Sequence, residues 1–129
     1  LLVTSRLAPD MRPLSAQIQF ASDTSKFAIS RLSGGTAPAM ADTETTIPEL
    51  RERIKKTVDY IKSVPASAVD GSEEREVVLK FPNGEMKFTG LNYLTGFVLP
   101  NFLFHVTTAY AILRHNGVPL GKGDFLGNG

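Results

Sequence analysis

Three polar side chains interrupt the most apolar stretch of the chain. Asn101, His105 and Thr108 follow one another at spacings of four and three residues, within a run of Phe, Leu and Val that ends at Gly117. At these spacings the three side chains share one face of an α-helix. An imidazole beside an amide and a hydroxyl could bind a ligand, hold a metal ion or move a proton. The same three residues could also be a satisfied polar part of a helical core.

Further polar candidates lie on an earlier predicted helix. Gln19 and Asp23 are four residues apart and share a face, whereas Gln17 lies on the apolar face of that helix. Either glutamine could reach a polar core position or remain a surface amide. His115 is ten residues from His105, about 15 Å along one helix, so the two histidines cannot bind the same metal ion within one subunit.

Composition excludes several classes of function. The chain has no cysteine, which excludes thiol catalysis, disulfides and thiolate metal sites. It has neither a G-x-S-x-G motif nor a glycine-rich phosphate loop after a strand. The 14 basic and 13 acidic residues leave a net charge of +1, so we expect no nucleic-acid partner.

The sequence indicates a soluble, cytoplasmic protein. Asn92, Asn101, His105 and Arg114 interrupt the longest apolar segment, so we expect no membrane span and no membrane partner. The lack of cysteine is compatible with a reducing compartment. Because the chain opens without an initiator Met or a signal peptide, we interpret it as a fragment that lacks its beginning.

Helix signals divide the first half of the chain into two helices. The first is predicted from Arg12 to Gly35, and the second begins at Thr46, which forms a capping box with Glu49, and ends at Pro65. Apolar residues expected to face inward are Leu14, Ile18, Ala21, Phe27, Ala28 and Leu32 on the first helix, and Leu50, Ile54, Val58 and Ile61 on the second. Residues expected on the solvated face of the second helix are Arg51, Glu52, Arg53, Lys55, Lys56, Asp59 and Lys62.

The second half predicts a hairpin and one long helix. Strands 76–81 and 85–89 alternate around Pro82-Asn83-Gly84. The last helix is predicted from Thr89 or Gly90 to about Asn116, with a kink near 96–100 because of Pro100. It is apolar nearly all round, and a lone small bundle would leave part of it uncovered. We therefore expect a homodimer that packs partly through Leu99, Phe102, Leu103, Val106 and Tyr110.

Several segments resemble a known superfamily. Residues 101–105, 107–114 and 117–118 resemble the last helix of the DinB-like (YfiT-like) four-helix bundles, and residues 7–11, 42–46 and 99–102 resemble an uncharacterised bacterial branch of that superfamily. The resemblance covers nearly the whole chain. Together with the predicted elements, it implies an all-α, up-and-down helical bundle with a small β-hairpin before its last helix, forming one domain over residues 1–129. Members of the branch carry one further helix before the point where this chain starts.

The resemblance also implies a metal site that this sequence does not reproduce. The superfamily is associated with nickel or zinc held by three histidines, two of them in an H-x-x-x-H pair on the last helix. Here His105 matches the second member of the pair, Asn101 replaces the first, and the stretch expected to supply the third offers only Gln17 and Gln19. Because one imidazole and two amides form a weak donor set, we expect no metal or other cofactor.

Two functions remain open from the sequence. One is a helical-bundle protein that acts as a homodimer, with a degenerate polar pocket around His105 for a possible small-molecule ligand. The other is a DinB-like, metal-dependent enzyme of the thiol-linked transferase type, with His105 as a metal ligand or acid/base. The residues expected to form the pocket are Asn101, His105, Thr108, Gln17, Gln19 and Asp23.

Overall fold

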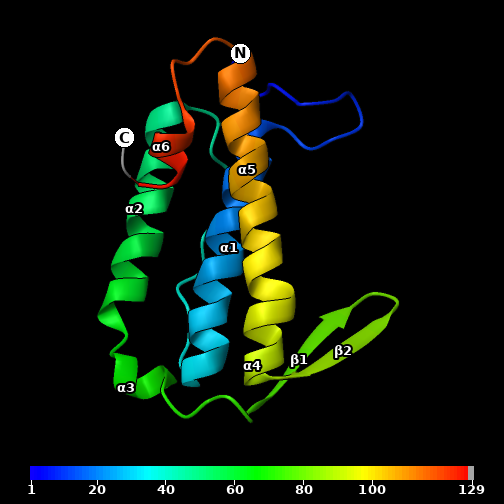
Figure 1. Ribbon diagram of the computed structural model, residues 1–129, viewed down its shortest axis with the longest axis vertical. Coiled ribbons are helices and arrows are strands. Elements are labelled where there is room, and N and C mark those ends of the chain that lie inside the picture. The colour runs from blue at the N-terminus through cyan, green and yellow to red at the C-terminus, as the bar shows by residue number, and fades with distance from the viewer. Residues whose placement is uncertain (128–129) are drawn as a thin grey trace.

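Three long helices and one hairpin make up most of the computed structural model, which describes residues 1–127 (Figure 1). The long helices are α1 (Leu14–Ser33), α2 (Ile47–Ser63) and α5 (Leu99–His115), and the hairpin consists of β1 (Glu76–Phe81) and β2 (Gly84–Thr89). Shorter elements are α3 (Ala66–Val69), α4 (Gly90–Tyr93), the π-helical turn η1 (Leu94–Val98) and α6 (Lys122–Phe125). The fold is therefore mostly helical with one two-stranded antiparallel sheet.

Helices α1 and α2 run in the same direction, and α5 runs opposite to both (Figure 1). The extended connection between Gly34 and Thr46 returns along the bundle before α2 begins. Two hydrogen bonds agree with the opposite direction of α5: Asn101 contacts Thr24 of α1, and the later residue His105 contacts the earlier residue Gln17. The predicted up-and-down order is therefore wrong for α1 and α2, because this connection is long enough to lead the chain back to the end where α1 starts.

The element boundaries lie close to the predicted ones. Gly34 ends α1 with a φ of 77°, a left-handed conformation that glycine adopts without a steric penalty. Thr46 caps α2 by accepting a hydrogen bond from the Glu49 backbone N–H, and Thr89 caps α4 in the same way. The hairpin pairs Glu76 with Thr89 and Phe81 with Gly84.

A π-helical turn, Leu94–Val98, lies where a kink near residues 96–100 was predicted. The backbone N–H of Leu99 donates to Leu94 O, five residues earlier. One extra residue in a turn rotates the preceding side chains by about 100° relative to those that follow. This rotation places Tyr93 on the same side as Asn101, facing α1, where its hydroxyl accepts a hydrogen bond from Arg31 Nη1 at 2.9 Å.

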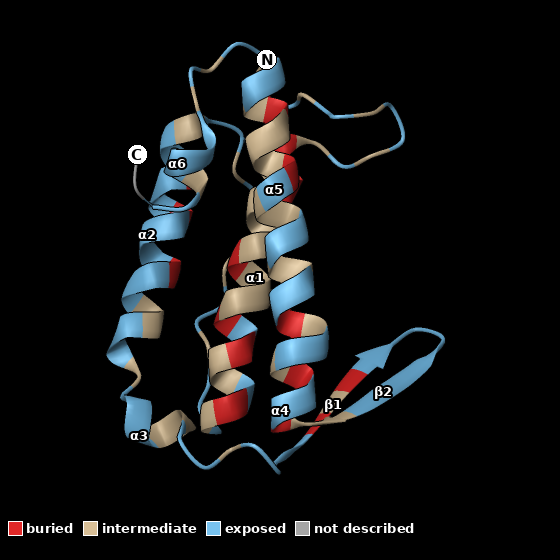
Figure 2. Ribbon diagram, viewed as in Figure 1, coloured by how far each residue is buried: buried red, intermediate tan, exposed pale blue. Residues whose placement is uncertain are grey.

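The apolar core gathers where the hairpin meets the C-terminal half of α1 (Figure 2). Tyr93 stacks on Phe97 there, and both rings lie near Phe88 of β2. The buried members of the cluster are Ala28, Leu32, Val77, Leu79, Tyr93 and Val98. The hairpin thus covers one end of the α1 and α5 pair, and Gln17 and His105 meet toward the other end.

Helix α2 buries Leu50 as predicted, but the rest of its buried face differs from the predicted one. Leu50, Arg53 and Thr57 are its buried residues, whereas Ile54 and Val58 remain 44% and 40% exposed. Their apolar stripe faces a groove rather than the contact with α1. The expectation that Arg53 is solvated is also wrong, because carboxylates around it replace water.

One inward-facing prediction for α1 also fails. Phe27 is 37% exposed, and its ring lies under the charged groups of Lys26 and Arg31, 4.7 and 5.3 Å from the ring centroid. A cation over an aromatic face is attracted by the ring quadrupole, which stabilises this exposed position.

The continuous helix Gly90–His115 is long and apolar enough to cross a membrane by length and composition. An 18-residue window within its 26 residues has a mean hydropathy of 1.4, and only 17% of that window is buried. The polar residues of this segment therefore do not lower its mean hydropathy below the value expected of a membrane span, contrary to the prediction. In the fold, the helix packs lengthwise against α1, to which Asn101 and His105 are hydrogen-bonded.

Candidate functional site

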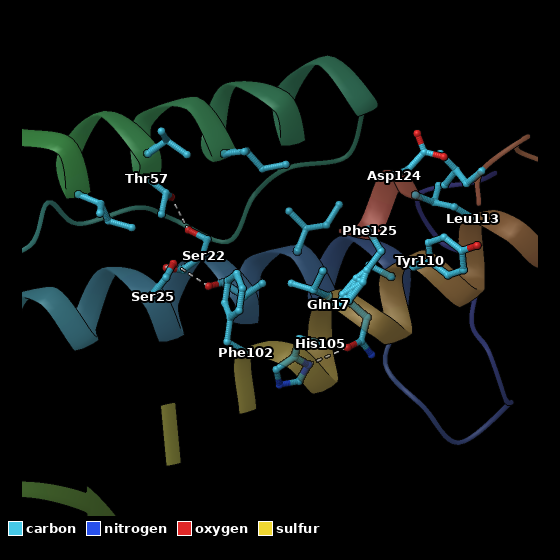
Figure 3. A pocket seen from close by; sticks show the side chains of 18 residues that line it. Gln17, Ser22, Ser25, Thr57, Phe102, His105, Tyr110, Leu113, Asp124 and Phe125 are labelled. Carbon is cyan, nitrogen blue, oxygen red and sulfur yellow. Dashed lines mark hydrogen bonds between the residues drawn. The ribbon is translucent and has the colours of Figure 1, made fainter. Parts of the chain in front are cut away.

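An apolar groove lies over α1, between α2 on one side and α5 on the other (Figure 3). Its volume is about 480 Å³, within the range of small-molecule sites. Its apolar lining residues are Ile18, Ala21, Ile54, Val58, Ile61, Phe102, Val106, Ala109, Tyr110, Leu113, Leu120 and Phe125. Its other lining residues are Gln17, Ser22, Ser25, Thr57, His105 and Asp124.

The groove follows from two apolar stripes that α6 and the residues before it cover only at one end. Ile54, Val58 and Ile61 on α2 face Phe102 and the following apolar residues of α5 across α1. The short helix α6 contributes Phe125 to one end (Figure 3). The sequence predicted an open side of α5 at Leu99, Phe102, Leu103, Val106 and Tyr110. The structure places Phe102, Val106 and Tyr110 in the groove, whereas Leu99 and Leu103 are not among its lining residues.

His105 and Gln17 form a hydrogen-bonded pair at the boundary between α5 and α1. His105 Nδ1 lies 2.7 Å from Gln17 Oε1, and Gln17 Nε2 donates to the backbone carbonyl of Arg12 at 3.1 Å. Because a carbonyl can only accept, the glutamine amide must turn its NH₂ toward Arg12 and its oxygen toward the ring. His105 therefore carries its hydrogen on Nδ1, and Nε2 retains its lone pair.

The second ring nitrogen of His105, Nε2, is free to accept a hydrogen bond. Among the described residues, His105 Nε2 has no hydrogen-bond partner. The buried side-chain atoms that lack a partner in that part of the chain are Arg53 Nε and Tyr60 OH, and Nε2 is not one of them. Nε2 is thus open to solvent. Burial lowers the pKa of His105 below its ordinary value because it disfavours the charged ring. At neutral pH the available nitrogen is therefore an acceptor.

Aromatic side chains fix the orientation of the His105 ring. Phe20 stacks on it with the ring centroids 4.9 Å apart and the planes at 26°, and Phe104 meets it edge-on at 5.2 Å. Arg12 lies over the Phe20 ring at 5.5 Å. The stack holds the imidazole between α1 and α5. These aromatic neighbours were not among the predicted site residues.

The other predicted residues of α5 are satisfied within the bundle. Asn101 Nδ2 donates to Thr24 Oγ1 at 3.0 Å, so Asn101 and His105 both reach polar groups of α1. Thr108 is buried and donates to the carbonyl of Phe104 on its own helix at 2.8 Å. It therefore contributes no free hydroxyl hydrogen to the groove.

Gln19 and Asp23 lie away from His105, in a cluster of charges around Arg53. Gln19 donates to Glu44 at 3.0 Å, and Asp23 Oδ1 accepts from Arg53 Nη2 at 2.8 Å. Arg53 Nη1 also contacts Asp42 and Glu44, at 2.9 and 3.2 Å. This cluster joins α1, α2 and the connection between them. The structure thus separates these two predicted pocket residues from the groove.

The donor set around His105 does not fit a nickel or zinc ion. The Gln17 oxygen is occupied by the His105 ring, and Asn101 is engaged with Thr24. Across residues 1–127 there is no group of three or more His, Cys, Asp or Glu side chains placed to hold a metal. A single imidazole is one donor where zinc sites use at least three.

Comparison with known proteins places this geometry in a family. Residues 1–126 match the family described as Domain of unknown function (DUF1993). The chain belongs to the DUF1993 family. This DUF1993 chain is also similar to the crystal structure of a DinB family member protein from Shewanella denitrificans, at 40% identity with a TM-score of 0.88. The match covers 97% of this chain and 71% of the Shewanella chain.

These similarities confirm the resemblance to a branch of the DinB-like superfamily. No curated protein matches the DUF1993 chain. The family description names no activity, and neither does the description of the Shewanella protein. Any function must therefore be argued from the groove and from His105.

Proposed function

We propose that this DUF1993 protein binds a small apolar molecule in the groove, beside a metal-free His105, and that it acts as a homodimer. One observation carries the proposal: a groove of about 480 Å³ over α1 has an almost wholly apolar lining, and His105 is among the few polar residues that line it. Small-molecule sites combine this kind of lining with a few placed polar groups. Residues 1–127 contain no group of three or more His, Cys, Asp or Glu side chains placed to hold a metal, and the apolar lining supports binding as the proposed activity.

Binding of an uncharged fluorescent probe tests the proposal. We expect N-phenyl-1-naphthylamine to bind saturably, with one site per chain, and to brighten as it leaves water. Ala109→Trp places a large side chain in the groove and should weaken binding at least about tenfold, equivalent to about 1.4 kcal/mol. Lys62→Trp adds the same side chain at an exposed position of α2 and should leave binding unchanged.

Two results would contradict the binding proposal. One is non-saturable probe fluorescence that Ala109→Trp does not alter. The other is probe binding that weakens as the protein concentration rises, because a helix of a second copy would then fill the groove in place of a ligand.

Dimerisation is supported by exposed leucines on α5, the helix that also lines the groove. Leu99 and Leu103 of α5 are 46% and 49% exposed and lie one turn apart. Exposed apolar residues that continue an apolar groove are typical of interfaces, and twofold symmetry is the commonest arrangement. The sequence predicted Leu99, Phe102, Leu103, Val106 and Tyr110 for this contact. Because Val106 also lines the groove, Leu103 is the cleaner position to change.

The dimer has a direct test by light scattering. We expect a mass of two chains for the unmodified protein above micromolar concentration, and one chain for Leu103→Glu, because the new charge would be buried in an apolar contact. Leu126→Glu places the same charge at another exposed leucine, just after α6, and should remain dimeric. A soluble monomer for the unmodified chain would overturn this part of the proposal.

A further inference from the structure

Strand β2 is the open edge of the hairpin. Its partner β1 carries the buried residues Val77 and Leu79, whereas residues 84–87 of β2 are all exposed (Figure 2). The sheet has two strands, so β2 pairs with β1 alone in the part of the chain that the structure describes. An open edge presents backbone N–H and C=O groups that another strand can pair with.

The free backbone groups of this edge belong to Glu85 and Lys87. The two-residue loop Pro82-Asn83 is closed by the pair Phe81 and Gly84. Such a closing pair exchanges its backbone hydrogen bonds, and in an antiparallel ladder hydrogen-bonded pairs alternate with pairs that are not bonded. Every second residue of β2, beginning with Gly84, therefore bonds to β1. The N–H and C=O groups of Glu85 and Lys87 point outward, and within residues 1–127 no other element supplies them with a backbone partner.

The charges on this edge are complementary to those of a second copy of the chain. Glu85 and Lys87 flank Met86, and their side chains are 47% and 64% exposed. When two β2 strands pair antiparallel about a twofold axis at Met86, each Glu85 lies opposite the partner's Lys87. Opposite charges in this position stabilise the pairing and like charges destabilise it. An axis at Glu85 or at Lys87 would oppose like charges, so the charge pattern favours the axis at Met86.

The same register joins the uncovered apolar ends of two hairpins. Met86 lies on the same face of the hairpin as Leu79, its cross-strand partner. Toward the base of the hairpin this face is buried in the core, but Phe81 and Met86 near the tip are 43% and 47% exposed. At the proposed axis the two Met86 side chains meet on this face. Removing their apolar surface from water favours association.

From these observations we infer that β2 pairs antiparallel with β2 of a second copy, so that the two hairpins form one four-stranded sheet with a twofold axis at Met86. Each Glu85 then exchanges two backbone hydrogen bonds with the partner's Lys87. The inference rests on the proposed homodimer. It adds a strand contact to the contact proposed at Leu103.

A cysteine at the axis tests the register. The chain has no cysteine of its own, and Met86→Cys places one opposite its own copy with the Cα atoms about 4.5 Å apart, within the range of a disulfide. Phe81→Cys is the matched control, because it is exposed on the same face but lies on β1, three strand spacings or about 14 Å from its copy. After oxidation with copper phenanthroline, a non-reducing gel should show a covalent dimer for Met86→Cys and a single chain for Phe81→Cys.

Charge exchange tests the complementarity. Lys87→Glu opposes two carboxylates in both of the pairs that flank the axis, so the Kd of the dimer should rise about tenfold in analytical ultracentrifugation. Adding Glu85→Lys to this variant restores opposite charges across the axis and should recover most of the loss. Lys55→Glu breaks an exposed ion pair with Asp59 on α2 and should leave the Kd unchanged.

The outcomes distinguish this inference from the proposed homodimer. The inference is overturned if the unmodified protein is a dimer but Met86→Cys forms no more covalent dimer than Phe81→Cys. It is also overturned if Lys87→Glu leaves the Kd unchanged, or if adding Glu85→Lys does not lower the raised Kd. The homodimer would survive these results and would form through α5 alone. If the unmodified protein is a monomer, the homodimer and the inference both fail.

Discussion

Replacing Arg53 with methionine is expected to lower the free energy of unfolding by about 3 to 5 kcal/mol, as measured by urea denaturation. Arg53 is 2% exposed and contacts Asp23, Asp42 and Glu44 at once. Methionine fills similar space but leaves the Glu44 carboxylate without its cation in a largely buried place. Losing one partner of a buried ion pair is costly because an uncompensated charge remains.

Two further variants isolate the Arg53 effect. Arg51→Met makes the same substitution at an exposed position of α2 and should change stability by no more than about 0.5 kcal/mol. Adding Glu44→Gln to Arg53→Met should restore part of the loss, because it removes an unpaired negative charge. A loss below about 1 kcal/mol for Arg53→Met would show that the cluster is not a principal stabilising contact between α1, α2 and their connection.

The second large effect is expected at Gly90, the first residue of α4. A Cβ atom on Gly90 would overlap the carbonyl oxygen of Ser72 and lie 3.2 Å from Leu32 Cδ2. The Ser72 segment cannot move freely, because Leu91 N donates to Glu73 O at 2.9 Å. Gly90→Ala should therefore destabilise the protein by about 3 kcal/mol, since added atoms force the backbone apart in a packed region.

Gly96 supplies the matched control for Gly90. It lies in the π-helical turn of the same continuous helix, and a Cβ there would meet no other atom within 4 Å. Gly96→Ala should stabilise the helix by about 0.5 to 1 kcal/mol, because alanine loses less conformational entropy than glycine. Equal effects of the two substitutions in urea unfolding would contradict the close approach of Gly90 to Ser72.

Local signals in the sequence predicted most of the individual elements. Gly34 requires a positive φ, Thr46 and Thr89 offer capping hydroxyls, and the hairpin alternates between apolar and polar residues. Each of these signals acts within a few residues. The pairing of Asn101 and His105 with α1 was also predictable, because helical spacing places both on one face. Their partners on α1 depend on how the two helices align.

Long-range features were not predictable in the same way. The shared direction of α1 and α2 depends on the path of the connection between them, which has no helical or strand periodicity. Arg53 looks like one of seven charged residues on a solvated face, and only the carboxylates of Asp23, Asp42 and Glu44 in three dimensions make its burial favourable. Its spacing of three from Leu50 and four from Thr57 is the one signal that could have identified the buried face.

The metal content of the purified protein tests the metal-free assignment of His105 most directly. His105 Nδ1 is hydrogen-bonded to Gln17, and the described residues include no group of three or more His, Cys, Asp or Glu side chains that could hold a metal. Elemental analysis of protein prepared without a histidine tag and dialysed should therefore find far less than one zinc or nickel per chain. Close to one metal per chain, lost together with His105 in the His105→Phe variant, would contradict this assignment and favour a DinB-like metalloenzyme.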